Sequence, residues 1–210
     1  MIRPLPLAFW WSTGGLTGLF FLSLALLAAS HQPLPGDITA FNWVRTWQSP
    51  VLTSGMRAIT RFGEVEVLLP LILLVALILW RSWRQFAIAQ CGLVAGAPLF
   101  EWVIKYWVGR PRPEGTGLGF PSGHVVAAAV AYGLLAYLFW TVASRTATRW
   151  TALVILFVVV GAVAVSRVYL QKHWPSDAVG GVVGGVAYLI PGLAWLDRTR
   201  PGGSSPDSKE

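Results

Sequence analysis

The chain has 210 residues, of which 55% are hydrophobic and only 12% are charged, and its formal net charge is +7. Soluble domains carry about 25% charged residues, so this composition excludes an ordinary soluble domain and indicates one integral membrane domain. The basic balance is typical of membrane proteins whose cytoplasmic loops collect Lys and Arg. Nucleic acid is not an expected partner, because no basic stripe lies on a polar face.

Six hydrophobic stretches come near the roughly 20 apolar residues that a membrane-spanning helix needs. We predict an all-α, polytopic membrane bundle with spans at Leu7–Ala29, Val65–Trp80, Phe86–Trp107, Val125–Val142, Trp150–Val165 and Ala178–Leu196. Residues 1–197 are expected to form a single domain. The polar, Gly- and Pro-rich residues 198–210 are expected to be a disordered cytoplasmic tail.

Two of these spans have alternative interpretations. Arg3 and the small residues Ala28–Ser30 also resemble a secretory signal peptide, although the apolar stretch is long for one. In the last span, four glycines predict close helix packing inside the bundle, with a dimer face as the alternative. These glycines are Gly180, Gly181, Gly184 and Gly185.

The segment Ala40–Phe62 alternates apolar and aromatic side chains with polar residues and three arginines. We interpret it as one or two short helices that lie on the membrane surface. Such a segment could be a packing lid over the bundle or, alternatively, a gate for a lipid tail.

Three short polar motifs lie at the ends of predicted spans, where an uncompensated charge is costly. They are Lys105-x6-Arg112-Pro113, Pro121-Ser122-Gly123-His124 and Ser166-Arg167-x5-His173-x3-Asp177. The first two flank the loop after the third span, and the last forms the loop after the fifth. Loops after odd-numbered spans share one side of the membrane, so we expect all three motifs at one face, opposite both termini.

The distribution of basic residues predicts which face this is. Lys and Arg divide evenly between the two sides, but Lys105, Arg112 and Arg167 are committed to the motifs. Without these three, the side of the termini carries the excess, which is typical of cytoplasmic loops. We therefore expect cytoplasmic termini in a bacterial inner membrane and a site on its outer face.

The motifs together could hold a phosphate group. Ser122 is a candidate N-cap for the fourth span, where free amides form an anion site. Gly123 lets the backbone approach a phosphate oxygen. The cations of Lys105, Arg112 and Arg167 could neutralise phosphoryl oxygens without magnesium.

The same motifs could also cleave a phosphate. They supply a nucleophile and a second imidazole for proton transfer, in His173 and His124. Asp177 lies four residues after His173, close enough to accept a hydrogen bond from its ring. These three residues are also acceptable metal ligands by type, but three converging cations would repel a divalent ion. We expect neither a metal nor another cofactor.

The order and spacing of the motifs resemble the type-two phosphatidic acid phosphatase superfamily, the lipid phosphate phosphatases. The resemblance implies a helical membrane bundle whose site opens near the bilayer surface. It implies that His173 forms a phosphohistidine, that Asp177 orients it, and that His124 protonates the leaving oxygen and then activates water. The implied phosphate-binding residues are Lys105, Arg112, Ser122, Gly123 and Arg167.

The expected partners are the bilayer and a membrane lipid phosphate, with no obligatory protein partner. Candidate substrates are undecaprenyl pyrophosphate, phosphatidylglycerol phosphate and phosphatidic acid, and the short loop 114–120 carries no large headgroup-reading insert. A lipid phosphotransferase using the same site, or a non-catalytic binder of lipid phosphates, are the alternative functions.

Several polar residues near the motifs have no assigned role. We interpret Arg110 as a turn or surface charge, because its spacing from Lys105 is too short for the motif. Glu101 lies one helical turn before Lys105 and is expected to form a structural ion pair with it. Lys172 is interpreted as a solvated loop lysine, with attraction of a second phosphate as the alternative, and His31 as a loop residue.

Overall fold

The computed structural model describes residues 5–199, and within that range the regular structure is helical apart from one isolated bridge between Pro111 and Leu118. The prediction of an all-α chain is confirmed. The helices are α1 (Leu7–Ala28), α2 (Asp37–Arg45), α3 (Pro50–Thr60), α4 (Val65–Leu79), α5 (Arg84–Val108), α6 (Gly123–Val142), α7 (Thr146–Tyr169) and α8 (Pro175–Thr199), with a 3₁₀ turn at Arg61–Gly63.

Five of these helices are each long and apolar enough to cross a membrane. The pair Pro50–Gly63 and Val65–Leu79, bent by 42°, gives a sixth candidate span. About six spans were predicted, and this is confirmed. The second predicted span is short, since α4 covers only 15 residues and reaches the length of a span only when it is taken together with α3.

The helices α7 and α8 run furthest beyond their predicted apolar stretches. α7 covers 24 residues instead of Trp150–Val165, because its polar first and last turns are also helical. α8 continues to Thr199, so the first two residues of the predicted tail are helical. Residues 200–210 lie outside the described residues, and their disorder stays a prediction.

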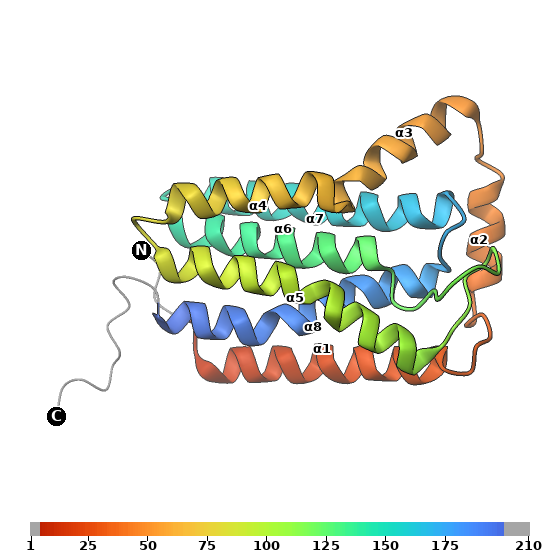
Figure 1. Ribbon diagram of the computed structural model, residues 1–210, viewed down its shortest axis with the longest axis horizontal. Helices are drawn as coiled ribbons and strands as arrows, with labels where there is room; N and C mark the ends of the chain where they lie inside the picture. Colours follow the sequence, from red (N-terminus) through yellow and green to blue (C-terminus); the bar gives the residue numbers. More distant parts are fainter. Residues whose placement is uncertain (1–4, 200–210) are drawn as a thin grey trace.

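The helices α1, α4, α5, α6, α7 and α8 run along the long axis of the bundle, and α6 lies among them (Figure 1). In α6, 61% of the 18 residues that form its apolar stretch are buried. Its small Ala, Gly and Val residues let neighbouring helices approach closely. The outer helices expose large apolar side chains such as Leu16, Leu77 and Phe157. An apolar exterior of this kind is the surface that lipid tails would cover.

The glycines of α8 face its neighbours inside the bundle. A Cβ atom at Gly184 would overlap the ring of Phe21 on α1, and one at Gly185 would overlap Ala129 on α6. The predicted close packing within the bundle is therefore confirmed for this helix. It brings both α1 and α6 into close contact with α8.

The segment between the first two spans forms two helices, as predicted. α2 lies across one end of the bundle, and α3 slopes from it toward α4 (Figure 1). α2 packs Phe41 against the ring of Trp174, with centroids 5.1 Å apart. The backbone amide of Ser49, just before α3, donates to the hydroxyl of Tyr169 at 3.2 Å. These contacts attach both helices to the end of the bundle.

The loops α1–α2, α5–α6 and α7–α8 all lie at this same end, which we call the motif end (Figure 1). The described chain begins and ends at the opposite end. The three polar motifs therefore share one end of the bundle, as the parity of the spans predicted.

Candidate active site

The first motif begins in the last turn of α5. Lys105 forms an ion pair with Glu101, at 2.5 Å between Nζ and Oε1, which confirms the predicted pair. α5 ends at Val108, and its C-cap residue Gly109 has a φ of 67°, in the left-handed region that favours glycine at a helix C-terminus. The prolines at 111 and 113 then prevent the helix from continuing.

Arg112 lies in a tight hairpin formed by residues 110–119. The amide of Gly119 donates to the carbonyl of Arg110 at 2.7 Å, and the amide of Arg112 donates to Gly117 at 3.2 Å. The Arg112 side chain donates from Nε to the carbonyl of Leu118 at 3.2 Å. The hairpin fixes the guanidinium stem and leaves its terminal nitrogens available to a ligand or to Glu114, which lies 3.7 Å away.

The second motif forms the N-terminus of α6. Ser122 occupies the N-cap position, as predicted, but its side chain makes no capping hydrogen bond. Its Oγ is buried and has no partner within residues 5–199. Gly123 packs so closely against the Glu101 carboxylate that a Cβ atom would overlap it. The first amides of a helix have no carbonyl partner within it, so this turn offers donors to an anion.

His124 points toward Glu64 at the start of α4. Its Nε2 lies 3.8 Å from the Glu64 carboxylate, and each side chain is about one-third exposed at 33%. The cations of Arg167, Lys105 and Arg112 act on this ring, as does the imidazole of His173 when it is protonated. The structure therefore gathers residues from all three motifs around His124.

Arg167 lies in the last turn of α7 and is buried. Its Nη1 donates to the hydroxyl of Thr60 at 3.1 Å. Its Nε is buried and has no partner among the described residues. One edge of the guanidinium is thus anchored to the end of α3, and Nε remains a donor for a ligand.

His173 and Asp177 face one another at the start of α8. Nδ1 of His173 lies 3.6 Å from Oδ2 of Asp177, and the two side chains are 1% and 0% exposed. This separation is a polar contact slightly longer than the hydrogen bond expected from the sequence. Burial lowers the pKa of His173, and Asp177 opposes part of this effect. A lowered pKa keeps the ring neutral, as a nucleophile requires.

Arg110 is buried, whereas the sequence predicted a turn or surface charge. It is not a surface charge: its side chain is fully buried, and its Nη1 donates to Oδ1 of Asp177 at 2.9 Å. Its Nη2 pairs with Asp37 at 2.7 Å. A buried guanidinium needs carboxylate partners, and neither partner was visible from local spacing, because Asp37 and Asp177 are distant in the chain.

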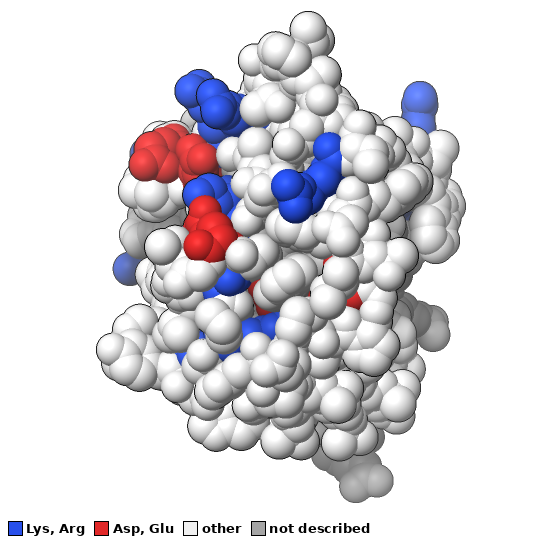
Figure 2. All heavy atoms as spheres, turned by 90° about the vertical axis from the view of Figure 1, so that its right-hand side faces the viewer, with Lys and Arg blue, Asp and Glu red and all other residues white. Residues whose placement is uncertain are grey.

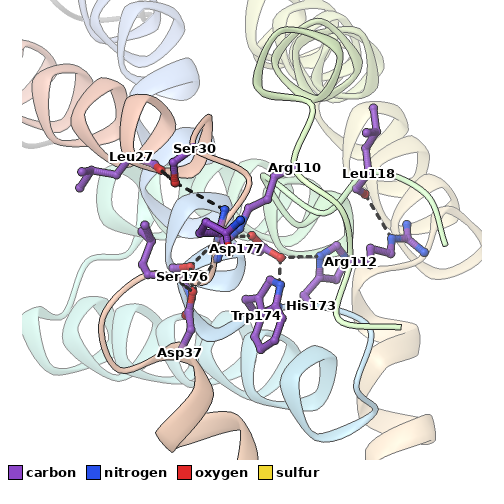
Figure 3. A network of polar contacts seen from close by, with 12 residues as sticks. Leu27, Ser30, Asp37, Arg110, Arg112, Leu118, His173, Trp174, Ser176 and Asp177 are labelled. Carbon is purple, nitrogen blue, oxygen red and sulfur yellow. Dashed lines mark hydrogen bonds and ion pairs between the residues drawn. The ribbon is translucent and has the colours of Figure 1, made fainter. Parts of the chain in front are cut away.

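Asp37, the first residue of α2, holds the start of α8 as well as Arg110. Its two oxygens accept from the amide and the hydroxyl of Ser176, at 2.8 and 2.6 Å. Figure 3 shows Asp37, Arg110, Ser176 and Asp177 converging beside His173. This buried network, Asp37–Arg110–Asp177, joins the first turns of α2 and α8 to the loop after α5.

Three residues of the site were missed, and all come from the segment before α4. They are Asp37, Thr60 and Glu64. Asp37 and Glu64 could have been noticed in the sequence, because they are two of only nine Asp and Glu residues in an apolar chain. Thr60 gives no comparable signal, because a lone threonine at a helix end is common.

The exposed side of the motif end carries paired charges. Lys172 donates to Glu114 at 2.6 Å, and this hydrogen bond is the largest cause of the lowered pKa of Glu114. Lys172 is thus an exposed loop lysine, as predicted, with a carboxylate partner that the sequence did not indicate. Figure 2 shows acidic and basic side chains lying next to one another on this end.

The model of the PAP2 superfamily matches residues 86–201, which is more than half of the chain. The chain belongs to the PAP2 superfamily. The resemblance found from the three motifs is thereby confirmed. In this PAP2 protein, the matched region contains all three motifs, whereas α1–α4 lie outside it.

Relatives of this PAP2 protein are named as bacterial phosphatases. It is 30% identical to phosphatidylglycerophosphatase B of Bacillus subtilis over 188 residues, covering 83% of this chain and 91% of that protein. It is also 30% identical to the decaprenylphosphoryl-5-phosphoribose phosphatase of Mycobacterium tuberculosis over 159 residues, covering 68% of this chain and 82% of the relative.

The fold is similar to a crystal structure of a transmembrane PAP2-type phosphatidylglycerolphosphate phosphatase from Bacillus subtilis. The TM-score is 0.81 at 26% identity, and the alignment covers 90% of this chain and 98% of the other. Together these relationships identify a multi-pass membrane phosphatase of the lipid phosphatase family.

Proposed function

We propose that this protein hydrolyses phosphate or diphosphate groups of membrane lipids through a phosphohistidine on His173. The observation that carries the proposal is the buried imidazole of His173, which faces the carboxylate of Asp177 and is influenced by the cations of Arg167 and Lys105. A neutral ring with its proton on Nδ1, toward Asp177, leaves the lone pair of Nε2 free for attack.

The first step transfers the phosphoryl group to the protein. A bond forms between Nε2 of His173 and phosphorus, and the bond between phosphorus and the lipid oxygen breaks. The leaving oxygen takes a proton from His124. In the second step, His124 accepts a proton from water, the water oxygen bonds to phosphorus, and the phosphorus–nitrogen bond breaks. Inorganic phosphate leaves and both histidines return to their starting states.

Phosphate binding is assigned to donors from the three motifs. Lys105, Arg112 and Arg167 neutralise the phosphoryl oxygens, and the unpaired Nε of Arg167 is a ready donor. The buried hydroxyl of Ser122 and the amide of Gly123 complete the cradle. We assign no metal to the reaction, because these three cations supply the positive charge that phosphoryl transfer needs.

We propose a lipid phosphate as the substrate, with undecaprenyl pyrophosphate, phosphatidylglycerol phosphate and phosphatidic acid as candidates. The Bacillus relative is named for phosphatidylglycerophosphate and the Mycobacterium relative for a decaprenyl-linked phosphate. The short hairpin after α5 carries no large insert that would read a headgroup, which favours broad specificity among these lipids.

The decisive assay measures phosphate release from a panel of these lipids by the purified protein in EDTA. We expect activity in EDTA, and we expect His173→Ala to abolish it, while His31→Ala serves as a matched control. A phosphoryl label should remain on the wild type after alkaline quenching and be absent from His173→Ala. Full activity of His173→Ala would overturn the mechanism, and transfer of label to an added alcohol would indicate a phosphotransferase.

We further propose that the motif end faces the outside of a bacterial inner membrane and that the termini are cytoplasmic. The chain has a single cysteine, Cys91, so a Cys91→Ala background allows single-site labelling. A membrane-impermeant thiol reagent applied to intact cells should label Thr116→Cys in the α5 hairpin but not Ser82→Cys before α5. The reverse pattern would invert the topology.

A further inference from the structure

Arg110 lies between two carboxylates at the motif end, and no sequence motif assigns it a role. Its side chain is 0% exposed, and those of Asp37 and Asp177 are 2% and 0% exposed. Burying charges is costly even when they are paired. We therefore expect the three buried charges behind the proposed nucleophile to have a role in its function.

The arrangement fixes both oxygens of Asp177. Oδ1 accepts from Nη1 of Arg110 at 2.9 Å, and Oδ2 accepts from the amide of Trp174 at 3.0 Å. Oδ2 is also the oxygen that faces Nδ1 of His173 (Figure 3). The carboxylate plane is therefore held from two sides, and rotation away from His173 would break the bond to Arg110.

Arg110 is in turn held by Asp37. Nη2 donates to Oδ2 of Asp37 at 2.7 Å, while Nη1 also donates to the hydroxyl of Ser176 at 2.7 Å. Asp37 is anchored independently by the amide of Leu34 at 2.8 Å and by the amide of Ser176 at 2.8 Å. The guanidinium thus has one position, set by α2 on one side and by α8 on the other.

Arg110 differs from Arg112 in what it can reach. Both terminal nitrogens of Arg110 are committed to buried partners, whereas the Arg112 side chain is 28% exposed. The terminal nitrogens of Arg110 therefore cannot bind the phosphate without breaking the network, and its remaining nitrogen, Nε, is buried and has no partner among the described residues. The contact of Nη1 with Asp177 is the route by which Arg110 acts on His173.

We propose that Arg110 and Asp37 are positioning residues that hold Asp177 against His173 and balance its charge. This inference rests on the proposed function, since it takes His173 as the nucleophile. The competing explanation is that the network only fastens α2 to α8 and would affect stability alone.

The two explanations differ in steady-state kinetics. Asp37→Asn and Arg110→Lys are expected to lower kcat by about 10- to 100-fold and to leave KM unchanged. Losses of about this size are typical when a residue that orients a metal ligand from behind is changed, and we expect the same for residues that orient Asp177. Arg112→Lys, which changes a proposed phosphate contact, should mainly raise KM. Asp197→Asn is the matched control, because Asp197 is a buried carboxylate at the opposite end that accepts from the amide of Leu5 at 2.7 Å.

The pH profile gives a second, more specific readout. The titratable groups that act on His173 are Asp177 from α8, Arg167 from α7, Lys105 from α5 and His124 from α6, with Arg110 behind Asp177. Asp37→Asn leaves the charge of Arg110 less compensated, so the pKa of His173 and the acid limb of kcat/KM should move to lower pH. Arg110→Gln removes that charge, so the acid limb should move to higher pH.

The experiment measures kcat, KM and the pH profile of the full-length protein in detergent, with the folded fraction determined for each variant. We expect the acid limb to move to lower pH in Asp37→Asn and to higher pH in Arg110→Gln. It should not move in Asp197→Asn. If Arg110→Gln does not fold, the Asp37→Asn profile and the kcat of Arg110→Lys decide. Variants that lose activity only in proportion to their folded fraction, without a shift, would overturn the positioning role. An inactive wild type would instead overturn the proposed function.

Discussion

The backbone amide of Ser122 donates a hydrogen bond to the carbonyl oxygen of Asp177, at 3.0 Å. This bond ties the N-terminus of α6 to the first turn of α8, so the helices that carry His124 and Asp177 begin at the same place. A backbone hydrogen bond therefore helps to position His124, the proposed proton donor, relative to Asp177, which is proposed to orient the nucleophile.

The contact between α6 and α8 depends on Gly181. A Cβ atom there would lie 2.7 Å from Cβ of Val125 and 2.9 Å from the carbonyl oxygen of Ser122. We expect Gly181→Ala to separate the two helix N-termini, to destabilise the protein by about 1–3 kcal/mol, and to reduce kcat. Thermal unfolding in detergent and phosphate release measure the two effects. Gly161→Ala on α7, where a Cβ meets nothing within 4 Å, should leave both unchanged.

His124 is predicted to act as the general acid. His124→Ala should lower kcat by about 10²–10⁴-fold, the usual contribution of general acid–base catalysis. A substrate with a more acidic leaving group needs less protonation, so it should lose less activity in this variant. Comparing a lipid phosphate with an aryl phosphate measures the difference. Equal losses on both substrates would contradict the assigned role.

Gly123 is predicted to matter because of Glu101. Gly123→Ala would push its Cβ into the Glu101 carboxylate and disturb the ion pair with Lys105. We expect a higher KM for the lipid phosphate, because Lys105 is a proposed phosphate contact. If the clash is the cause, Glu101→Ala should have a smaller additional cost in the Gly123→Ala background than in the wild type, which a double-mutant cycle measures. Additive losses would exclude the clash.

The pH dependence of activity should reflect the buried His173. Burial lowers its pKa below the ordinary value of 6.5, so the neutral form of this proposed nucleophile persists below that pH, and we expect the acid limb of kcat/KM there. Asp177→Asn removes an influence that raises this pKa, so its acid limb should move to lower pH while kcat falls. The ratio of the two profiles on one substrate cancels ionisation of the phosphate. A limb that moves to higher pH would contradict the prediction.

The same pKa shift has a consequence for stability. A histidine whose pKa is lowered by folding binds its proton more readily in the unfolded chain, so stability is present above pH 6.5 and is lost as the pH falls toward the folded value. His173→Asn should show a smaller loss of thermal stability between pH 7 and pH 5 than the wild type. An identical loss in both would show that other groups cause it.

The spans and the gathering of the motifs were predictable because both depend on local or periodic signals. Apolar stretches locate the membrane helices, and the parity of the spans places the motifs at one end. The four-residue spacing of His173 and Asp177 likewise places them together at the start of α8. The ends of α7 were not predictable, because its polar terminal turns are helical without being apolar.

The network behind Asp177 could not be read from the sequence. Asp37 is separated from Ser176 by 139 positions and from Arg110 by 73 positions, and no periodic pattern connects them. Arg110 was misassigned for the same reason, since a cation beside two prolines looks like a turn charge until its distant partners are known. Only the packing of α2 across the bundle end brings the three together.

The region that matches the family begins at residue 86, yet Asp37, Thr60 and Glu64 contact the motif residues from earlier in the chain. The motifs and their partners are thus divided between two parts of the polypeptide that could vary separately among relatives. A chimera that exchanges residues 1–80 between two members would give Arg110, Arg167 and His124 foreign neighbours. Functional exchange of this part therefore requires that the three contacts be transplanted together with the residues they support.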